Sequence, residues 1–281
     1  MLKLLALLLT VSPAKAEIKA LDQLNINSYS VELPQPEFSL YKAFEDLDTN
    51  LSGENLFQYL HKRTEIKNPI TYTGSSNIMF SSVDNFTCEN GKQGVFAFYS
   101  LICVNGYTSE GADYKEKGDQ NGDGFAGDFM NVEHIWPQSF FNKNLPMRAD
   151  LHHLRPTFSK PNGYRGTAPF YYVSSYVYAT NSGAKFDGEY FEPPDAVKGD
   201  VARSLLYFVV RYYDRQIKPA DYYDFFVSKI NTYLQWNRQD PPDSYEKERN
   251  DRIYVYQGNR NPFVDDYTLA DRIGEKIFSS H

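Results

Sequence analysis

The chain has 281 residues, which allows one large domain or two small ones and is ample for a hydrophobic core. Its formal net charge of −7 argues, at first sight, against a nucleic-acid partner. Aromatic residues make up 16% of the chain, which excludes a disordered polypeptide and favours a compact fold.

Residues 1–16 have the pattern of an export signal. A short positive start precedes an apolar run from Leu4 to Val11, and Ala14-Lys15-Ala16 is a small-x-small cleavage site. The run is far shorter than the roughly 20 residues that span a bilayer, and no later segment is apolar enough to do so. We therefore expect an exported protein, periplasmic or extracellular, that begins near Glu17. The alternative is a buried N-terminal helix.

Residues 17–50 are polar with scattered prolines and predict a loosely ordered arm. A helix is expected from Glu54 to Thr64, because apolar residues recur at helical spacing and Ser52 can cap it. Short extended segments are expected at Ile70–Thr73 and Ile78–Phe80.

The two cysteines, Cys88 and Cys103, predict one disulfide in an exported chain. A metal site built on two thiols is the alternative, but the CxxC spacing is missing. The residues between the cysteines suggest a turn followed by a strand.

The second half of the chain predicts mostly helices. Their apolar stripes are most simply explained as residues of the hydrophobic core. They are expected at Asp195–Asp214 with Asp200 as N-cap, Asp221–Trp236, Ser244–Tyr256 and Leu269–Phe278. The chain shows no repeat and no flexible linker, so residues 51–281 are expected to form a single domain.

Residues Asp119–Phe125 read D-x-N-x-D-G, the first half of a calcium loop of the EF-hand type. Oxygen ligands would come from Asp119, Asn121, Asp123 and Phe125. The twelfth position is Met130 in place of glutamate, so Asp128 or a distant acid would have to close the loop. The alternative is a surface turn rich in glycine and aspartate.

The segment Asn131–Ser139 places a carboxylate beside an imidazole, Glu133 next to His134, in a chain with only five histidines. Hydrolysis of a phosphodiester requires a base, a cation and hard oxygen ligands for that cation. His134 can supply the base, and Glu133 and Asn162 can supply the oxygens. Adjacent side chains on a strand point to opposite faces, so the pair can share a site only at a strand end or in irregular backbone.

Several segments together resemble the endonuclease I family of exported bacterial nucleases. The matching segments are Asn131–Phe140, Asp150–Pro156, Asn162–Arg165, Lys198–Arg203, Asn250–Ile253 and Gln257–Val264. They follow the family's order, whereas the chain before Asn131 resembles the family only weakly.

The resemblance implies an α+β fold of helices and short strands around a ββα-metal (His-Me finger) core. His134 would be the general base at the end of the first strand. Glu133 and Asn162 would bind one Mg²⁺. The last matching segment, Gln257–Val264, is expected to be a packed structural closure.

The resemblance also implies supporting roles for Asp150, His152 and His153, with both histidines in the second strand. Some relatives carry a longer, cysteine-stapled insertion bearing an arginine that steadies the transition state, and this chain lacks it. The candidate substitutes are Arg148, Arg155 and Arg165. Arg165 is preferred because it lies one helical turn from Asn162.

The acidic chain has a locally basic segment between His134 and Phe170. It contains Lys143, Arg148, Arg155, Lys160 and Arg165 against Asp150 alone. A basic site on an acidic body suits phosphate binding, although ordinary solvated charges are the alternative.

We therefore expect an exported, Mg²⁺-dependent, monomeric endonuclease that leaves 5′-phosphate ends and has little sequence preference. DNA is the expected substrate and RNA a second candidate; no membrane partner is expected, and Ca²⁺ is a candidate structural ion. The rival from another class is a calcium-dependent binding module with an inactive Glu-His site. A zinc hydrolase is disfavoured, because His134, His152 and His153 lack a helical i, i+4 pair.

Overall fold

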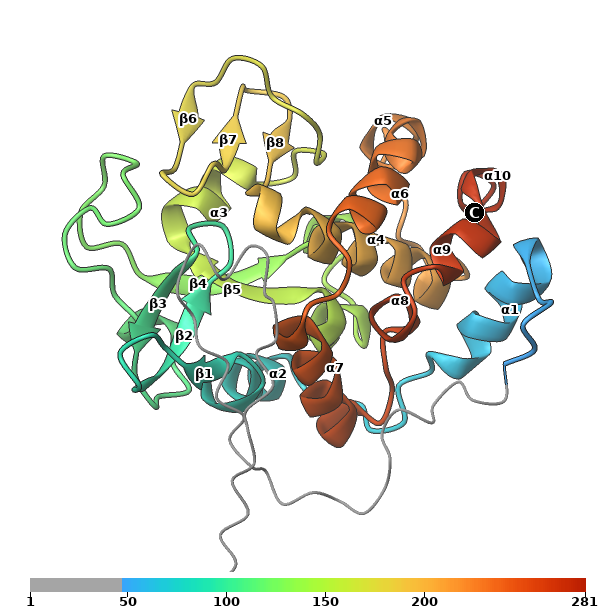
Figure 1. Ribbon diagram of the computed structural model, residues 1–281, viewed down its shortest axis with the longest axis horizontal. Helices are drawn as coiled ribbons and strands as arrows, with labels where there is room; N and C mark the ends of the chain where they lie inside the picture. The colour runs from blue at the N-terminus through green and yellow to red at the C-terminus, as the bar shows by residue number, and fades with distance from the viewer. Residues whose placement is uncertain (1–46) are drawn as a thin grey trace, which may run out of the picture.

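The structure, a computed structural model, describes residues 47–281. The expected export signal, residues 1–16, and the arm as far as residue 46 lie outside the described residues. Figure 1 shows a central two-stranded ribbon with most of the helices on one side and two small sheets on the other. Within residues 47–281, no helix is both long and apolar enough to cross a membrane.

The strands are short and their pairings are antiparallel. They are β1 (Asn85–Thr87), β2 (Gln93–Ala97), β3 (Ile102–Asn105), β4 (Met130–His134), β5 (Leu154–Phe158), β6 (Tyr178–Ala179), β7 (Lys185–Phe186) and β8 (Phe191–Glu192). The sheets are β1-β2-β3, β4-β5 and β6-β7-β8. Cys88 and Cys103 form the expected disulfide, which ties the end of β1 to β3. The backbone N–H of Phe98 donates to the carbonyl of Pro156 at 2.8 Å, so the first sheet adjoins β5.

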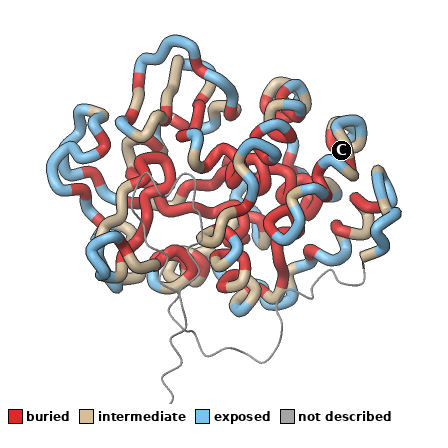
Figure 2. The backbone as a smooth tube through the Cα atoms, viewed as in Figure 1, coloured by how far each residue is buried: buried red, intermediate tan, exposed pale blue. Residues whose placement is uncertain are grey.

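The helices form most of the remaining structure. They are α1 (Gly53–Arg63), α2 (Tyr72–Ile78), α3 (Ser159–Arg165), α4 (Lys198–Tyr212), α5 (Tyr222–Phe225), α6 (Ile230–Gln239), α7 (Ser244–Gln257), α8 (Pro262–Asp265), α9 (Leu269–Ile273) and α10 (Glu275–Phe278). Helix α4 is buried along its whole length and packs against α1 and α6. Figure 2 shows buried backbone concentrated around α4 and the central ribbon. The predicted α+β class is confirmed.

The extended segments expected near residues 70–80 are wrong. Residues Tyr72–Ile78 form α2, and Met79–Val83 continue it as a π-helical turn. The Thr71 hydroxyl accepts the N–H of Gly74, which caps the helix, and Asn68-Pro69 lie just ahead of it. Short apolar runs do not distinguish a strand from a buried helical turn, and here the cap favours the helix.

Three other expectations about helices need correction. The continuous helix over Asp221–Trp236 is interrupted at Phe226, where φ is −130°, so α5 and α6 are separated by a 3-10 turn. Helix α4 begins at Lys198, which places Asp200 in its first turn and not at the N-cap. Asp200 accepts a hydrogen bond from Arg203 at 3.1 Å. The predicted last helix is divided into α9 and α10 at Gly274, whose φ is +84°.

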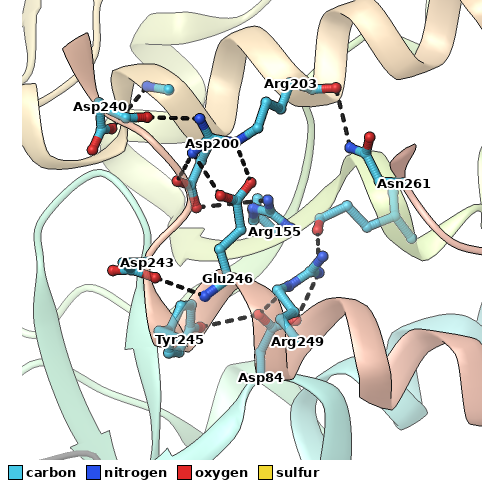
Figure 3. Close-up of polar contacts among 12 residues, drawn as sticks. Asp84, Arg155, Asp200, Arg203, Asp240, Asp243, Tyr245, Glu246, Arg249 and Asn261 are labelled. Carbon is cyan, nitrogen blue, oxygen red and sulfur yellow. Dashed lines mark hydrogen bonds and ion pairs between the residues drawn. The ribbon is translucent and has the colours of Figure 1, made fainter. Parts of the chain in front are cut away.

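A buried ion-pair network joins α7 to α4 and β5 (Figure 3). Arg203 on α4 is 2.5 Å from Glu246 on α7. Arg249 on α7 pairs with Asp84 at 2.7 Å. Arg249 also donates to the carbonyls of Leu151 and Leu154, at 3.1 and 2.7 Å. The network therefore fixes the start of β5, whose first residue pairs with the last residue of β4.

Candidate active site

Strands β4 and β5 and helix α3 form a ββα unit, as the resemblance implied. The register pairs His134 with Leu154 and Glu133 with Arg155, and α3 follows β5 directly. Asp128 lies at the N-terminus of α3, where its carboxylate accepts the N–H of Lys160 at 2.7 Å and the Ser159 hydroxyl. A carboxylate at a helix N-terminus complements the helix dipole and satisfies free N–H groups.

Glu133 is buried, with 3% of its surface exposed. The Tyr99 hydroxyl donates to its Oε1 at 2.8 Å, and the Nε of Arg165 is 3.4 Å from the same oxygen. Burial raises the pKa of this carboxyl to about 7, although Arg165 and the Tyr99 hydrogen bond oppose the shift. A cation bound to this carboxyl would further favour the ionised form.

His134 lies on the other side of β4. Its Nε2 is 3.2 Å from the carbonyl oxygen of Arg148, and its ring stacks near Tyr72, with 5.7 Å between ring centroids. A carbonyl oxygen can only accept, so this contact places the ring hydrogen on Nε2 and leaves Nδ1 as the proton acceptor. Burial, followed by the nearby His153, lowers the pKa of His134 to about 3. The imidazole is therefore neutral near pH 7 and able to accept a proton.

Asn162 on α3 supplies a second oxygen on the Glu133 side. Its Nδ2 donates to Oδ1 of Asn131 at 2.6 Å and to the carbonyl of Val132 at 3.3 Å. Asn131 and Glu133 are two residues apart on β4 and share one face. Among residues 47–281, none donates a hydrogen bond to Oδ1 of Asn162, so this oxygen is available to a cation.

The carboxylate of Glu133 and the amide oxygen of Asn162 are hard oxygen ligands. Two ligands alone do not complete the coordination of a metal ion. Across the described chain, no group of three or more His, Cys, Asp or Glu side chains is arranged to hold a metal. A cation between Glu133 and Asn162 would therefore take its other ligands from water and substrate. That arrangement suits Mg²⁺, which commonly keeps several waters.

The side chains of Glu133 and His134 have different neighbours. Glu133 contacts Tyr99 and Arg165, whereas His134 contacts Tyr72 and the Arg148 backbone. Strand β4 ends at His134, as a shared site would require, but the contacts place the two side chains against different neighbours.

The expectation that His152 and His153 lie in the second strand is wrong. They form a 3-10 turn, Leu151–His153, just before β5. The turn forms because Asp150 accepts the N–H of His152 at 3.1 Å, which caps it. The ring of His153 lies 5.5 Å from that of His134, and its Nε2 is 2.7 Å from the carbonyl of Met147.

Asp150 is a buried acceptor that four groups share. Besides the His152 N–H, it accepts hydrogen bonds from Tyr207 and Tyr212, each at 2.8 Å, and from Gln257 at 3.0 Å. Oε1 of Gln257 accepts the N–H of Leu151 at 2.6 Å. These bonds tie the turn before β5 to α4 and to the end of α7, which is the packed closure expected for Gln257–Val264.

A family model described as Endonuclease I matches residues 52–267. The chain belongs to the endonuclease I family. It is 39% identical over 178 residues to an extracellular ribonuclease of Bacillus amyloliquefaciens, covering 59% of each chain. It is 33% identical over 132 residues to a periplasmic deoxyribonuclease of Aeromonas hydrophila, covering 44% of this chain and 49% of the relative. An extracellular deoxyribonuclease of A. hydrophila is 32% identical over 126 residues, covering 42% and 50%. The chain thus spans about half to three-fifths of the length of these relatives.

The three candidate arginines of this endonuclease I family member occupy different environments. Arg165 is 1% exposed and donates to the carbonyls of Ile135 and Gly166, at 2.6 and 2.8 Å. Arg155 is also buried, 3.8 Å from Asp200. Arg148 is partly exposed, and its guanidinium lies 3.9 Å from the centre of the Tyr72 ring. The basic segment predicted from the sequence therefore presents fewer cations to solvent than its composition suggests.

Sequence reasoning missed two aromatic neighbours of the site, Tyr72 and Tyr99. Tyr72 begins α2 and stacks near His134, and Tyr99 follows β2 and bonds to Glu133. The chain has 23 tyrosines, and neither of these two lies in one of the short segments on which the resemblance was recognised from the sequence. Only the packing of α2 and β2 against the ββα unit shows their position.

Proposed function

We propose that this protein is an exported, metal-dependent endonuclease that hydrolyses phosphodiester bonds in DNA, and in RNA as a second substrate, with little sequence preference. The observation that carries the proposal is the ββα unit itself: β4 ends on Glu133 and a buried His134 whose pKa is lowered, and α3 places Asn162 against Asn131 and Val132 of the same strand. Membership of the endonuclease I family supports it. The names of the relatives include ribonucleases and deoxyribonucleases, all described as extracellular or periplasmic, which supports both substrates and export.

The residues divide the chemistry between them. A Mg²⁺ ion held by Glu133 and Asn162 would neutralise charge on the phosphate and on the leaving oxygen. Nδ1 of His134 accepts a proton from the attacking water, while Nε2 stays anchored on the Arg148 carbonyl. In-line attack then expels the 3′ oxygen and leaves 5′-phosphate ends, as the resemblance implies. Arg165 holds the Glu133 carboxylate, and Arg148 is the more exposed cation beside the base.

Digestion of supercoiled plasmid and of a structured RNA, with and without EDTA, tests the proposal. We expect EDTA to abolish cleavage of both. His134→Ala should cleave about 10²–10⁴-fold more slowly, the usual contribution of a positioned general base, while still binding DNA. His281→Ala, at the far end of the chain, is the matched histidine control and should cleave at the wild-type rate. A folded His134→Ala protein with activity within a few fold of wild type would refute the mechanism.

A further inference from the structure

We propose that the loop from Glu116 to Phe125 binds one Ca²⁺ ion, and that Glu116 supplies the acidic ligand that the sequence motif lacks. The motif has oxygen donors at its first, third and fifth positions, Asp119, Asn121 and Asp123. Its twelfth position holds Met130, which is buried and cannot bind a cation. The proposal does not depend on the nuclease activity.

Glu116 has a carboxylate oxygen, Oε2, without a hydrogen-bond partner among the described residues, and this suggests a missing ligand. The residue is 4% exposed, and its Oε1 accepts the N–H of Asn121, inside the loop, at 2.6 Å. Its Oε2 is buried and has no hydrogen-bond partner among the described residues. Leaving a buried carboxylate oxygen unpaired costs free energy, which a bound cation would remove.

The acidic side chains of the loop also shape its backbone. Burial raises the pKa of Glu116, and the charges of Asp123 and Asp119 raise it further. Asp119 accepts the N–H groups of Asp123 and Gly124, both at 3.0 Å, which curls the loop around Asn121. Oδ1 and Oδ2 of Asp119 each accept one such bond and keep a second lone pair for a cation, whereas Oδ2 of Asp123 already accepts bonds from Asn121 and Tyr178.

The loop is anchored on the β6-β7-β8 sheet. The Tyr178 hydroxyl donates to Oδ2 of Asp123 at 2.7 Å, and the carbonyl of Asn121 accepts the N–H of Asn181 at 2.7 Å. Gly124, at the sixth position, has a φ of +86°, which the sharp turn of such a loop requires. Asp128, considered from the sequence as the closing acid, already uses both oxygens at α3. Glu116 is therefore the better closing ligand.

The donor chemistry favours Ca²⁺. Carboxylate, amide and carbonyl oxygens are available, and the loop contains no histidine or cysteine that would favour zinc. The three acids of the described loop are not yet gathered into a compact cluster, so binding must draw Glu116, Asp119 and Asp123 together. Ca²⁺ tolerates such irregular, flexible coordination, whereas Mg²⁺ requires near-ideal octahedral geometry.

Titration of chelator-stripped full-length protein with Ca²⁺, followed by calorimetry and by melting temperature, tests the site. A parallel titration uses Mg²⁺. We expect Ca²⁺ to bind with a dissociation constant of about 10⁻⁴–10⁻³ M, as in extracellular modules, and to raise the melting temperature. Mg²⁺ should have a much smaller effect.

The variants identify the ligands. Glu116→Gln keeps an acceptor for the Asn121 N–H but loses the charge, so it should bind Ca²⁺ at least about tenfold more weakly. Asp123→Asn should do the same. Glu110→Gln, which changes an exposed acid just before the loop, should match wild type. A wild-type protein that does not respond to Ca²⁺, or a Glu116→Gln protein that responds as fully as wild type, would overturn the proposal.

Discussion

Arg165 lies 3.4 Å from Glu133, one of the two residues that we propose bind the metal. The guanidinium is fully buried and reaches Glu133 and two carbonyl oxygens, so no face of it is left for a substrate phosphate. The sequence suggested Arg165 as the arginine that steadies the transition state. Its burial favours a positioning role, in which it holds the Glu133 carboxylate ionised and correctly oriented.

Replacing Arg165 separates these two roles. If Arg165 positions the ligand, Arg165→Met should raise the Mg²⁺ concentration for half-maximal cleavage about 10–100-fold, and saturating Mg²⁺ should restore most of the rate. Arg165→Lys keeps the charge and should show a smaller shift. Far-UV circular dichroism confirms that each variant is folded. A rate that stays about 100-fold low at saturating Mg²⁺ would instead place Arg165 on the substrate.

At the scale of single residues, the sequence could nominate site members only where they are neighbours or stand in segments that resemble the family. Glu133, His134 and Asn162 were nominated in this way, and their roles stay predictions. Tyr99, 34 positions before Glu133, was not. Its hydrogen bond depends on how β2 packs against β5, which no local pattern in the sequence encodes.

At the scale of elements, prediction succeeded where the sequence marks the start of a helix. Helices α1 and α7 were predicted to within one residue at each end. Ser52 is the N-cap residue of α1, although its side chain makes no capping hydrogen bond, and Asp243, just after Pro241-Pro242, caps α7 by accepting the N–H of Glu246. Prediction failed where the apolar stripe was continuous but the helical backbone was interrupted. The break at Phe226 leaves its ring in the core, so the apolar pattern across it is unchanged.

The disulfide is the covalent element of the first sheet. Cys88 follows β1 and Cys103 lies in β3, so the bond closes a loop that contains β2. Replacing both cysteines with serine should lower the free energy of unfolding by about 3 kcal/mol, because the unfolded chain regains the entropy of that loop. Urea unfolding measures the loss, and wild type in a reducing agent should lose a similar amount. An unchanged unfolding midpoint would show that the bond contributes no stability.

At the scale of the whole molecule, buried titratable groups make the free energy of unfolding depend on pH in two opposite directions. Burial lowers the pKa of His152 and of His153 to about 4, so stability from these groups is present above about pH 6.5 and is lost as pH falls toward 4. Burial raises the pKa of Asp240 to about 7, so its contribution is lost as pH rises from about 4 toward 7. The net pH profile therefore cannot be assigned to either type of group without a variant.

His152→Gln isolates the histidine contribution. The ring Nε2 lies 3.2 Å from the carbonyl of Asn259, and a glutamine amide can keep that hydrogen bond without titrating. In wild type, moving from pH 7 to pH 5 should cost about 1–2 kcal/mol through His152 alone, because the unfolded chain binds a proton that the folded chain excludes. The variant should lose that much less stability over the same interval, measured by urea unfolding at both pH values. Equal losses in the two proteins would mean that His152 takes up its proton equally well in the folded state, and that its burial does not contribute to the acid sensitivity of the molecule.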